Sequence, residues 1–245
     1  MRALIQKRDD DFSSVNACAA YLGLQERGYE IEFFNAQNFD SKLIDADTIV
    51  VGGVPFVQRA FVRLGINAPN LESIPASLHE FAKRWLWTAT IGEVRSLIDQ
   101  GNSIFVKPIA GQLKNFAGHV AANYGDLAIT AGLPEHQMVS CSEPVQMVSE
   151  YRTYVTHGKT VGCKHYWGDY RRFPDFSVID SAIAAYTDLP AGYAIDFAVT
   201  DRGDTVLVEV NDGFSLGSYG LHPLLYSGLL EARWRELTSM LRNGG

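Results

Sequence analysis

The chain has 245 residues, of which 47% are hydrophobic and 20% charged, and 21 basic against 28 acidic side chains give a formal net charge of −7. That length suits one large domain or two small ones, and the composition excludes a disordered chain. The acidic balance argues against duplex nucleic acid as the main partner, and no apolar run approaches the roughly 18 residues of a membrane helix. Three cysteines without a CxxC spacing indicate neither a disulfide framework nor a zinc site, so a reducing cytoplasm is expected.

The N-terminal part of the sequence predicts a small α/β domain. Residues 3–6 and 29–34 are typical of strands, and residues 14–27 carry apolar side chains at helical spacing. Residues 47–53 form a β-branched run that ends in two glycines, as a buried parallel strand does. No GxGxxG or GxxxxGK[ST] motif accompanies it. The proline-containing stretch 69–75 is the expected boundary and divides the chain into residues 1–72 and 73–245.

The remainder predicts a larger domain in which strands dominate. A helix is expected from Ser77 to Trp87 and a second around residues 94–98, ended by Gly101. The strands expected after them are 103–108, 145–155, 160–167, 193–199 and 205–211, with hairpin turns at 157–158 and 202–203. A last amphipathic helix is expected over residues 223–241.

An acid and an amide near the end of an apolar strand are the most informative feature. Strand alternation places Glu209 and Asn211 on one face, and antiparallel pairing with the preceding strand brings Asp196 beside Glu209. Hard oxygen ligands of this kind are what Mg²⁺ prefers. The alternative reading is a solvated sheet edge with exposed polar side chains.

A lysine inside an apolar strand is the second feature. Lys107 stands in Ile-Phe-Val-Lys-Pro, and a loop with Gly111, Lys114 and Gly118 follows it. Such a lysine can hold a phosphate as a point charge, and the glycines allow the backbone to approach an anion closely. The alternative is a lysine whose stem lies along the sheet edge with its charge in water.

Three further groups of polar residues have both an ordinary and a functional reading. Glu150 and Arg152 share a strand face, as a surface ion pair or as the lining of a cleft. A polar and aromatic cluster after the next hairpin is either an ordinary loop or a wall that binds a carboxylate of a substrate, and it contains Lys164, Arg171 and Arg172. Ser215 and Ser218, in the loop over residues 213–221, are candidate contacts to the same substrate.

The combination of these features resembles the ATP-grasp superfamily. The segments FVKP, LKNFAGHV, SEYRTYV and EVNDGFSLGSYGL are similar to compact members of its R2K clade, over about Ser77 to Asn211 and beyond. The resemblance implies an α/β (α+β) protein with an ATP-grasp fold, in which two α+β lobes hold nucleotide between them. It also implies that residues 1–72 form a small pre-ATP-grasp α/β domain before the ATP-grasp domain of residues 73–245.

The resemblance implies nucleotide-binding roles for matching residues. Lys107 would contact the phosphates, and Gly111, Lys114 and Gly118 lie in the loop that would cover them. The sequence departs from the family at residues 135–138, where the usual second nucleotide lysine is absent. Lys114 or Lys164 is the expected substitute.

The other implied roles concern the hinge, the ribose and the metal. Glu150 would bind the ribose, and Arg152 would face a phosphate or acyl phosphate. The hinge that would contact adenine contains Glu143, Pro144 and Val145. The residues that would bind one or two Mg²⁺ are Asp196, Glu209 and Asn211.

These implied roles predict a cytoplasmic ligase that uses ATP and Mg²⁺. A small-molecule or peptide carboxylate would become an acyl phosphate, and an amine or another nucleophile would then displace phosphate. A kinase of a small molecule and a non-catalytic nucleotide-binding regulator are the alternatives. No membrane association and no general nucleic-acid binding are expected, and the sequence allows a homodimer.

Overall fold

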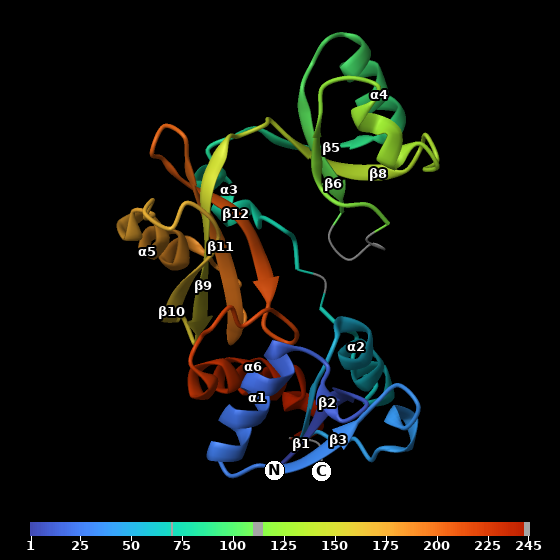
Figure 1. Cartoon of the computed structure of the whole chain (residues 1–245), viewed down its shortest axis with the longest axis vertical. Coiled ribbons are helices and arrows are strands. Elements are labelled where there is room, and N and C mark those ends of the chain that lie inside the picture. The colour runs from blue at the N-terminus through green and yellow to red at the C-terminus, as the bar shows by residue number, and fades with distance from the viewer. Residues whose placement is uncertain (70, 110–114, 243–245) are drawn as a thin grey trace.

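In a computed structural model, which describes residues 1–69, 71–109 and 115–242, the chain folds into three four-stranded sheets. Figure 1 shows them along the long axis of the molecule, with a small lobe at the top, a central sheet in the middle and an N-terminal sheet at the bottom. No helix in the described ranges is long and apolar enough to cross a membrane.

The N-terminal sheet is built on strand β1 (Arg2–Arg8), whose middle residues are fully buried. Parallel strands β3 (Glu30–Phe34) and β4 (Thr48–Val51) flank it, and short β2 (Asp11–Phe12) pairs with its end. Helix α1 (Val15–Glu26) begins where the Ser14 hydroxyl accepts a hydrogen bond from the Ala17 amide. These strands and this helix confirm the predicted α/β pattern. The 3₁₀ turn η1 (Phe39–Ser41) and helix α2 (Val54–Arg63) were not predicted.

The C-terminal helix completes the N-terminal core. Helix α6 (Pro223–Leu237) is followed by the short α7 (Ser239–Arg242), and the Trp234 ring stacks on Phe61 of α2 at 5.1 Å. Gly23 of α1 lies so close to α6 that a Cβ there would be 2.1 Å from the Pro223 carbonyl oxygen. This core therefore joins both ends of the chain, and a division at residues 72 and 73 stays a prediction.

The small lobe is an antiparallel sheet in the order β5-β8-β6-β7. Its strands are β5 (Leu86–Thr90), β6 (Ile104–Pro108), β7 (His119–Ala121) and β8 (Met138–Ser142). Helix α4 (Ile91–Asp99), as predicted for residues 94–98, begins in a capping box between Thr90 and Glu93, and a 3₁₀ turn η3 (Asp126–Thr130) follows β7. Strands β7 and β8 were not predicted.

The helix expected from Ser77 to Trp87 is wrong for most of its length. A 3₁₀ turn η2 (Ala76–Leu78) and helix α3 (His79–Ala82) form instead, and Lys83 ends α3 with a left-handed φ of 49°. The chain then enters β5, whose residues pair with β8. The strand prevails because pairing with β8, which lies about 50 residues later in the sequence, decides the local structure.

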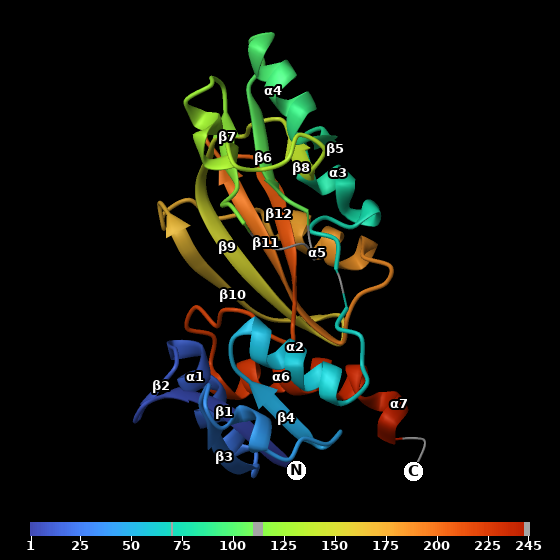
Figure 2. The same ribbon diagram turned by 90° about the vertical axis from the view of Figure 1, so that its right-hand side faces the viewer.

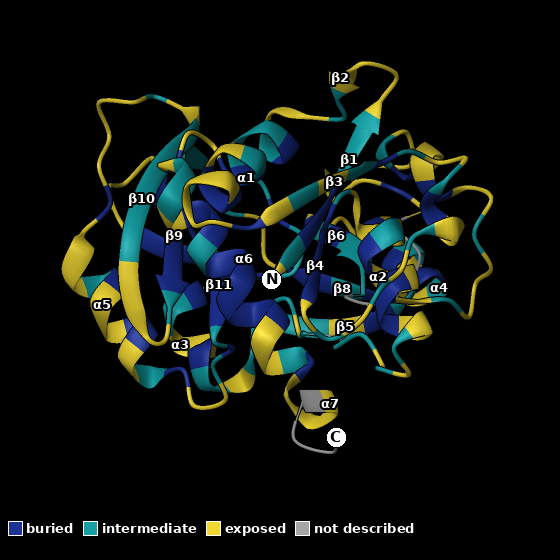
Figure 3. Ribbon diagram, turned by 90° about the horizontal axis from the view of Figure 1, so that it is seen from below, coloured by how far each residue is buried: buried dark blue, intermediate teal, exposed yellow. Residues whose placement is uncertain are grey.

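The central sheet confirms the predicted strands. Antiparallel strands β9 (Met147–Thr156), β10 (Lys159–Gly168), β11 (Gly192–Thr200) and β12 (Thr205–Asp212) run in the order β10-β9-β11-β12. The predicted hairpin turns form, with positive φ at His157, Gly158 and Gly203. All nine residues of β11 are buried, whereas β10 lies at the more exposed outer edge (Figure 3). Helix α5 (Phe176–Ala185) was not predicted.

Candidate active site

Four ionisable side chains stand opposite one another across the central sheet. Lys164 of β10 lies opposite Arg152 of β9, which in turn lies opposite Asp196 of β11. Glu209 of β12 lies opposite Asp196 on its other side. Since directly opposite residues of antiparallel strands point to the same face of the sheet, these four residues form one row from edge to edge, called the charged row below.

The middle of the charged row is a buried ion pair. The Arg152 guanidinium donates from Nε and Nη2 to the two carboxylate oxygens of Asp196, at 2.8 and 2.7 Å. Their side chains are only 8% and 2% exposed. Burial raises the pKa of Asp196 to about 6 while the hydrogen bond with Arg152 opposes that rise, so the carboxyl group is ionised at neutral pH. The Asn211 amide donates to the same carboxylate at 3.2 Å, which fixes its orientation.

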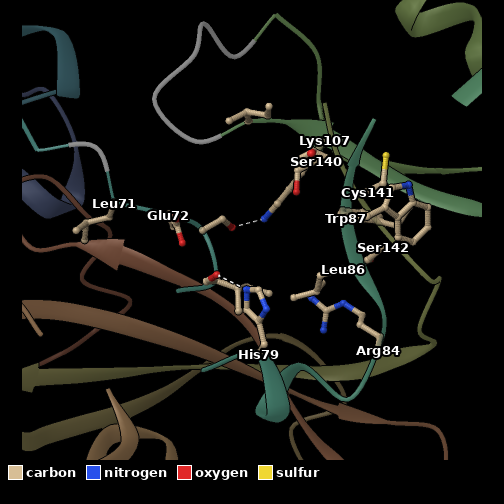
Figure 4. Close-up of a pocket in the computed structure, with 15 residues that line it drawn as sticks. Leu71, Glu72, His79, Arg84, Leu86, Trp87, Lys107, Ser140, Cys141 and Ser142 are labelled. Carbon is tan, nitrogen blue, oxygen red and sulfur yellow. Dashed lines mark hydrogen bonds between the residues drawn. The ribbon is translucent and has the colours of Figure 1, made fainter. Parts of the chain in front are cut away.

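The β12 end of the charged row meets the small lobe. The Lys107 ammonium on β6 lies 3.4 Å from a Glu209 carboxylate oxygen and donates to the Ser73 hydroxyl (Figure 4). The Ser73 carbonyl accepts from the Val210 amide of β12 at 2.8 Å, so the segment before α3 lies along this strand. Lys107 and Glu209 are 22% and 35% exposed, and a ligand can therefore reach both.

A cleft of about 890 Å³ lies beside this contact, between the small lobe and the central sheet. Figure 2 shows the two lobes from the side, with β6 and β7 standing over β9, β11 and β12. An adjoining cavity of about 410 Å³ shares Ser73, Arg84 and Lys107 with the cleft (Figure 4). The volume of the cleft is within the usual range for a site that encloses a nucleotide-sized ligand.

The connection between β8 and β9 forms one wall of the cleft. Both the backbone and the side chain of Glu143 bond to Trp85. The Glu143 amide donates to the Trp85 carbonyl at 3.2 Å, and the Glu143 carboxylate accepts from the Trp85 amide at 2.8 Å. Further along β9, the Glu150 carboxylate accepts a hydrogen bond from the Tyr166 hydroxyl. Burial raises the pKa of Tyr166, so this hydroxyl keeps its proton and remains a donor.

The structure brings eight of the predicted site residues to this cleft. Those that line it are Lys107, Gly118, Glu143, Val145, Glu150, Glu209, Asn211 and Ser215. Asp196 and Arg152 are buried and do not line the cleft, and Pro144 lies between two lining residues in the sequence. Gly111 and Lys114 fall outside the described residues.

The residues predicted to contact the acceptor are dispersed. The Ser215 hydroxyl donates to the Gly52 carbonyl at 3.0 Å, beside a cavity of about 350 Å³. Lys164 and Ser218 line a separate groove. Arg171 and Arg172 are exposed in the loop after β10 and line none of these four cavities.

Sequence reasoning missed two residues that line the cleft and one that stacks on the charged row. Ser73 pairs with Lys107, and Arg84 donates to the Leu207 carbonyl of β12 at 2.7 Å. Burial lowers the pKa of Arg84. The Tyr219 ring lies 5.0 Å from the Arg152 guanidinium and stacks on Tyr166. A left-handed φ of 41° at Tyr219 is unusual for a tyrosine, but no sequence pattern indicates it.

The residues at the β12 end fit a divalent cation. Among the described residues no cluster of three or more His, Cys, Asp or Glu side chains is arranged for a metal. Glu209 and Asn211 nevertheless present a carboxylate and an amide to the cleft, and the contact of Glu209 with Lys107 is long. Hard oxygen donors that leave positions for water and phosphate are what Mg²⁺ requires. These two residues would therefore hold the ion, with Asp196 next to them.

Comparison with protein families gives one match, and it spans all the strands of the central and small-lobe sheets. The model of the ATP-grasp domain, R2K clade family 2, matches residues 81–229. No curated protein matches the chain.

Solved structures share the whole fold at low identity. D-alanine–D-alanine ligase from Bacillus anthracis is 15% identical with a TM-score of 0.58, covering 98% of this chain and 97% of that one. A RimK domain ATP-grasp protein from Sphaerobacter thermophilus is 12% identical with a TM-score of 0.57, covering 93% and 97%. N5-carboxyaminoimidazole synthetase from Staphylococcus aureus, complexed with ADP, is 11% identical with a TM-score of 0.57, covering 95% and 77%. The fold is thus that of the ATP-grasp ligases.

Proposed function

This chain belongs to family 2 of the R2K clade of ATP-grasp domains, and from that premise we propose that it is an ATP- and Mg²⁺-dependent ligase joining a carboxylate to an amine. One observation carries the proposal. Lys107 of the small lobe and Glu209 of the central sheet lie 3.4 Å apart at the wall of one cleft. A cation and a metal-binding carboxylate beside a space of this size suit the phosphates of a nucleotide.

Different residues of the cleft would bind different parts of the nucleotide. The backbone of residues 143–145 would contact the adenine, and Glu150 would accept hydrogen bonds from the ribose hydroxyls. Lys107 would release the Ser73 hydroxyl and bind phosphate oxygens in its place. The ion held by Glu209 and Asn211 would neutralise charge on the transferring phosphoryl group. The ADP in the S. aureus synthetase supports a nucleotide in a cleft of this fold.

The reaction needs no nucleophile from the protein. An oxygen of the acceptor carboxylate attacks the γ-phosphorus, the bond to the ADP oxygen breaks, and an acyl phosphate forms. The nitrogen of the amine then attacks the acyl carbon, phosphate leaves with the bonding electrons, and the nitrogen loses a proton to solvent. Lys107 would stabilise the negative charge that develops between the two lobes, which is the main requirement of phosphoryl transfer. Arg152 is buried in its pair with Asp196 and would act by holding that carboxylate in place.

The test measures nucleotide binding and product formation with matched variants. Wild-type protein should bind ATP in the presence of Mg²⁺, and Lys107→Met and Glu209→Gln should each weaken that binding at least tenfold. Lys42→Met is the control, because Lys42 pairs with Glu32 at the surface of the N-terminal domain. Unchanged affinity in both cleft variants would refute the proposal.

Product analysis separates a ligase from a kinase. A ligase releases ADP and phosphate when both an acid and an amine are present, whereas a kinase accumulates a phosphorylated acceptor without an amine. Hydroxylamine tests the intermediate itself, because it traps an acyl phosphate as a hydroxamate and does not react in this way with a phosphorylated hydroxyl group. ADP release without any trapped hydroxamate would exclude the acyl-phosphate route.

A further inference from the structure

The β10 end of the charged row opens into a groove that the nucleotide chemistry does not use. The groove has a volume of about 690 Å³ and shares no lining residue with the nucleotide cleft. One side chain of β10, Lys164, enters it. Its walls are one side of helix α1 and the loop over residues 217–223.

The α1 wall is an apolar stripe that the fold does not cover. Val15, Cys18, Ala19 and Leu22 follow helical spacing and line the groove, with Val15 80% and Leu22 47% exposed. The buried residues of α1 are others, namely Ala17, Ala20, Gly23 and Leu24. The helix therefore has a second apolar face, and this one is open to a partner.

The charge of the groove is positive in an acidic protein. None of the residues that line it is acidic, although the chain carries 28 acids and a net charge of −7. Among the described residues, Lys164 has no ion pair or side-chain hydrogen bond. It also lies directly opposite Arg152, and like charges at such a position destabilise a sheet. Arg152 is neutralised by Asp196, so Lys164 is the cation that an anionic ligand would neutralise.

A pair of stacked aromatic rings lies between the groove and the cleft. Tyr219 lines it and stacks on Tyr166 at 4.9 Å, and the hydroxyl of Tyr166 donates to Glu150 in the cleft. Three strand spacings of about 4.8 Å separate Lys164 from Glu209 along the charged row, roughly 14 Å in all. A single amino acid is too short for that span, whereas about four extended residues at ~3.3 Å each cover it.

We propose that this groove binds a peptide acceptor, with apolar side chains on α1 and one carboxylate on Lys164, while a second carboxyl group of the same peptide reaches the cleft. The proposal rests on the proposed ligase function and specifies its acceptor as an acidic peptide. The reacting carboxyl group would be the one at the cleft, and Lys164 would fix the register of the peptide.

The test uses a pool of labelled pentapeptides with a carboxyl-terminal glutamate and leucine or valine at two other positions. Their binding to the full chain is measured by fluorescence anisotropy without nucleotide. Wild-type protein should bind members of this pool, and peptides amidated at both carboxyl groups should bind at least tenfold more weakly. Equal binding of the amidated peptides, or no binding of the pool, would overturn the proposal.

Two variants and one control locate the binding. Lys164→Met should weaken binding at least tenfold, whereas Lys159→Met, at the exposed start of the same strand, should not. Val15→Asp places an acid in the groove and should weaken binding as well. It leaves the fold intact because Val15 is exposed and begins a helix, where an acid is favourable. Wild-type affinity in either groove variant contradicts the proposed position.

The remaining outcomes separate this inference from the ligase proposal. Binding that depends on Lys164, in a protein without ATP affinity, would support the groove and refute the ligase. ATP binding without peptide binding would support the ligase proposal and refute the peptide groove. A dimer that Val15→Asp dissociates would show that a second copy of the chain covers the groove, and would overturn the inference.

Discussion

The middle and the two ends of the charged row differ in how their charges are paired. Arg152 and Asp196 in the middle are buried and joined by two short hydrogen bonds. At the β12 end Lys107 meets Glu209 at 3.4 Å and both are accessible, and at the β10 end Lys164 has no ionic partner among the described residues. Charges that hold the sheet together are thus saturated, and charges at its edges can accept ligands.

The physical reason is the cost of removing charge from water. A buried carboxylate is strongly destabilising unless its partner stays with it, so the middle pair cannot open without loss of stability. A partly exposed pair is screened and contributes little, so it exchanges partners readily. Substitutions along the row should therefore change stability in its middle and ligand binding at its ends.

The largest loss of stability is expected for Arg152→Met. Among the described residues, this change leaves the buried Asp196 carboxylate with the Asn211 amide as its one side-chain hydrogen-bond donor, and should lower the free energy of unfolding by about 3–5 kcal/mol. Urea denaturation measures it. The double variant Arg152→Met with Asp196→Leu removes both charges and should recover much of the loss. If the double variant were less stable than Arg152→Met, the ion pair would not be the cause.

A smaller loss is expected where the two lobes are joined. Glu143→Ala removes the acceptor of the Trp85 amide hydrogen bond and should cost about 1 kcal/mol. Glu143→Gln retains a side-chain oxygen at this position and should cost less. Equal stabilities of the two variants, measured by urea denaturation, would show that this hydrogen bond contributes nothing.

The sequence predicts the charged row only in part, for reasons of distance along the chain. Glu209 beside Asp196 follows from strand alternation and one short hairpin, and the structure pairs them. The contact between Arg152 and Asp196 depends on pairing β9 with β11, about 40 residues apart, and no local pattern encodes that register. Ser73 and Arg84 bind atoms of a different lobe, so their roles depend on packing between lobes.

Contacts between residues that are distant in the sequence also explain why the helix predicted for residues 77–87 is wrong. Residues 77–87 have apolar spacing that suits a helix, but Leu86 and Trp87 pair with β8. The long strands β9 to β12 were predicted nearly to their ends. The short strands β7 and β8 of the small lobe were not predicted, because pairing with neighbouring strands rather than a local sequence pattern determines them.

At the β12 end, stability and ligand binding should separate. Lys107→Met and Glu209→Gln should each change the free energy of unfolding by less than about 1 kcal/mol, because both groups are partly exposed. With ATP and Mg²⁺ at about a hundred times the dissociation constant, wild-type protein should gain ~2.7 kcal/mol. The variants should gain much less at the same concentrations. Thermal or urea denaturation with and without ATP measures this, and an equal gain in the variants would contradict the assignment.

The smallest effect is expected in the loop after β10, which contains an ion pair of the same geometry as the middle pair. Arg171 donates from Nε and Nη2 to both oxygens of Asp169, at 2.9 and 3.2 Å, but its side chain is 74% exposed. Water already solvates these charges, so Arg171→Ala should leave the urea midpoint unchanged in low and in high salt. Arg152 and Arg171 make the same two side-chain contacts, and burial is the main difference between the two pairs. A midpoint that fell for Arg171→Ala as far as for Arg152→Met would show that geometry alone stabilises these pairs, and the distinction between the middle and the ends of the charged row would be lost.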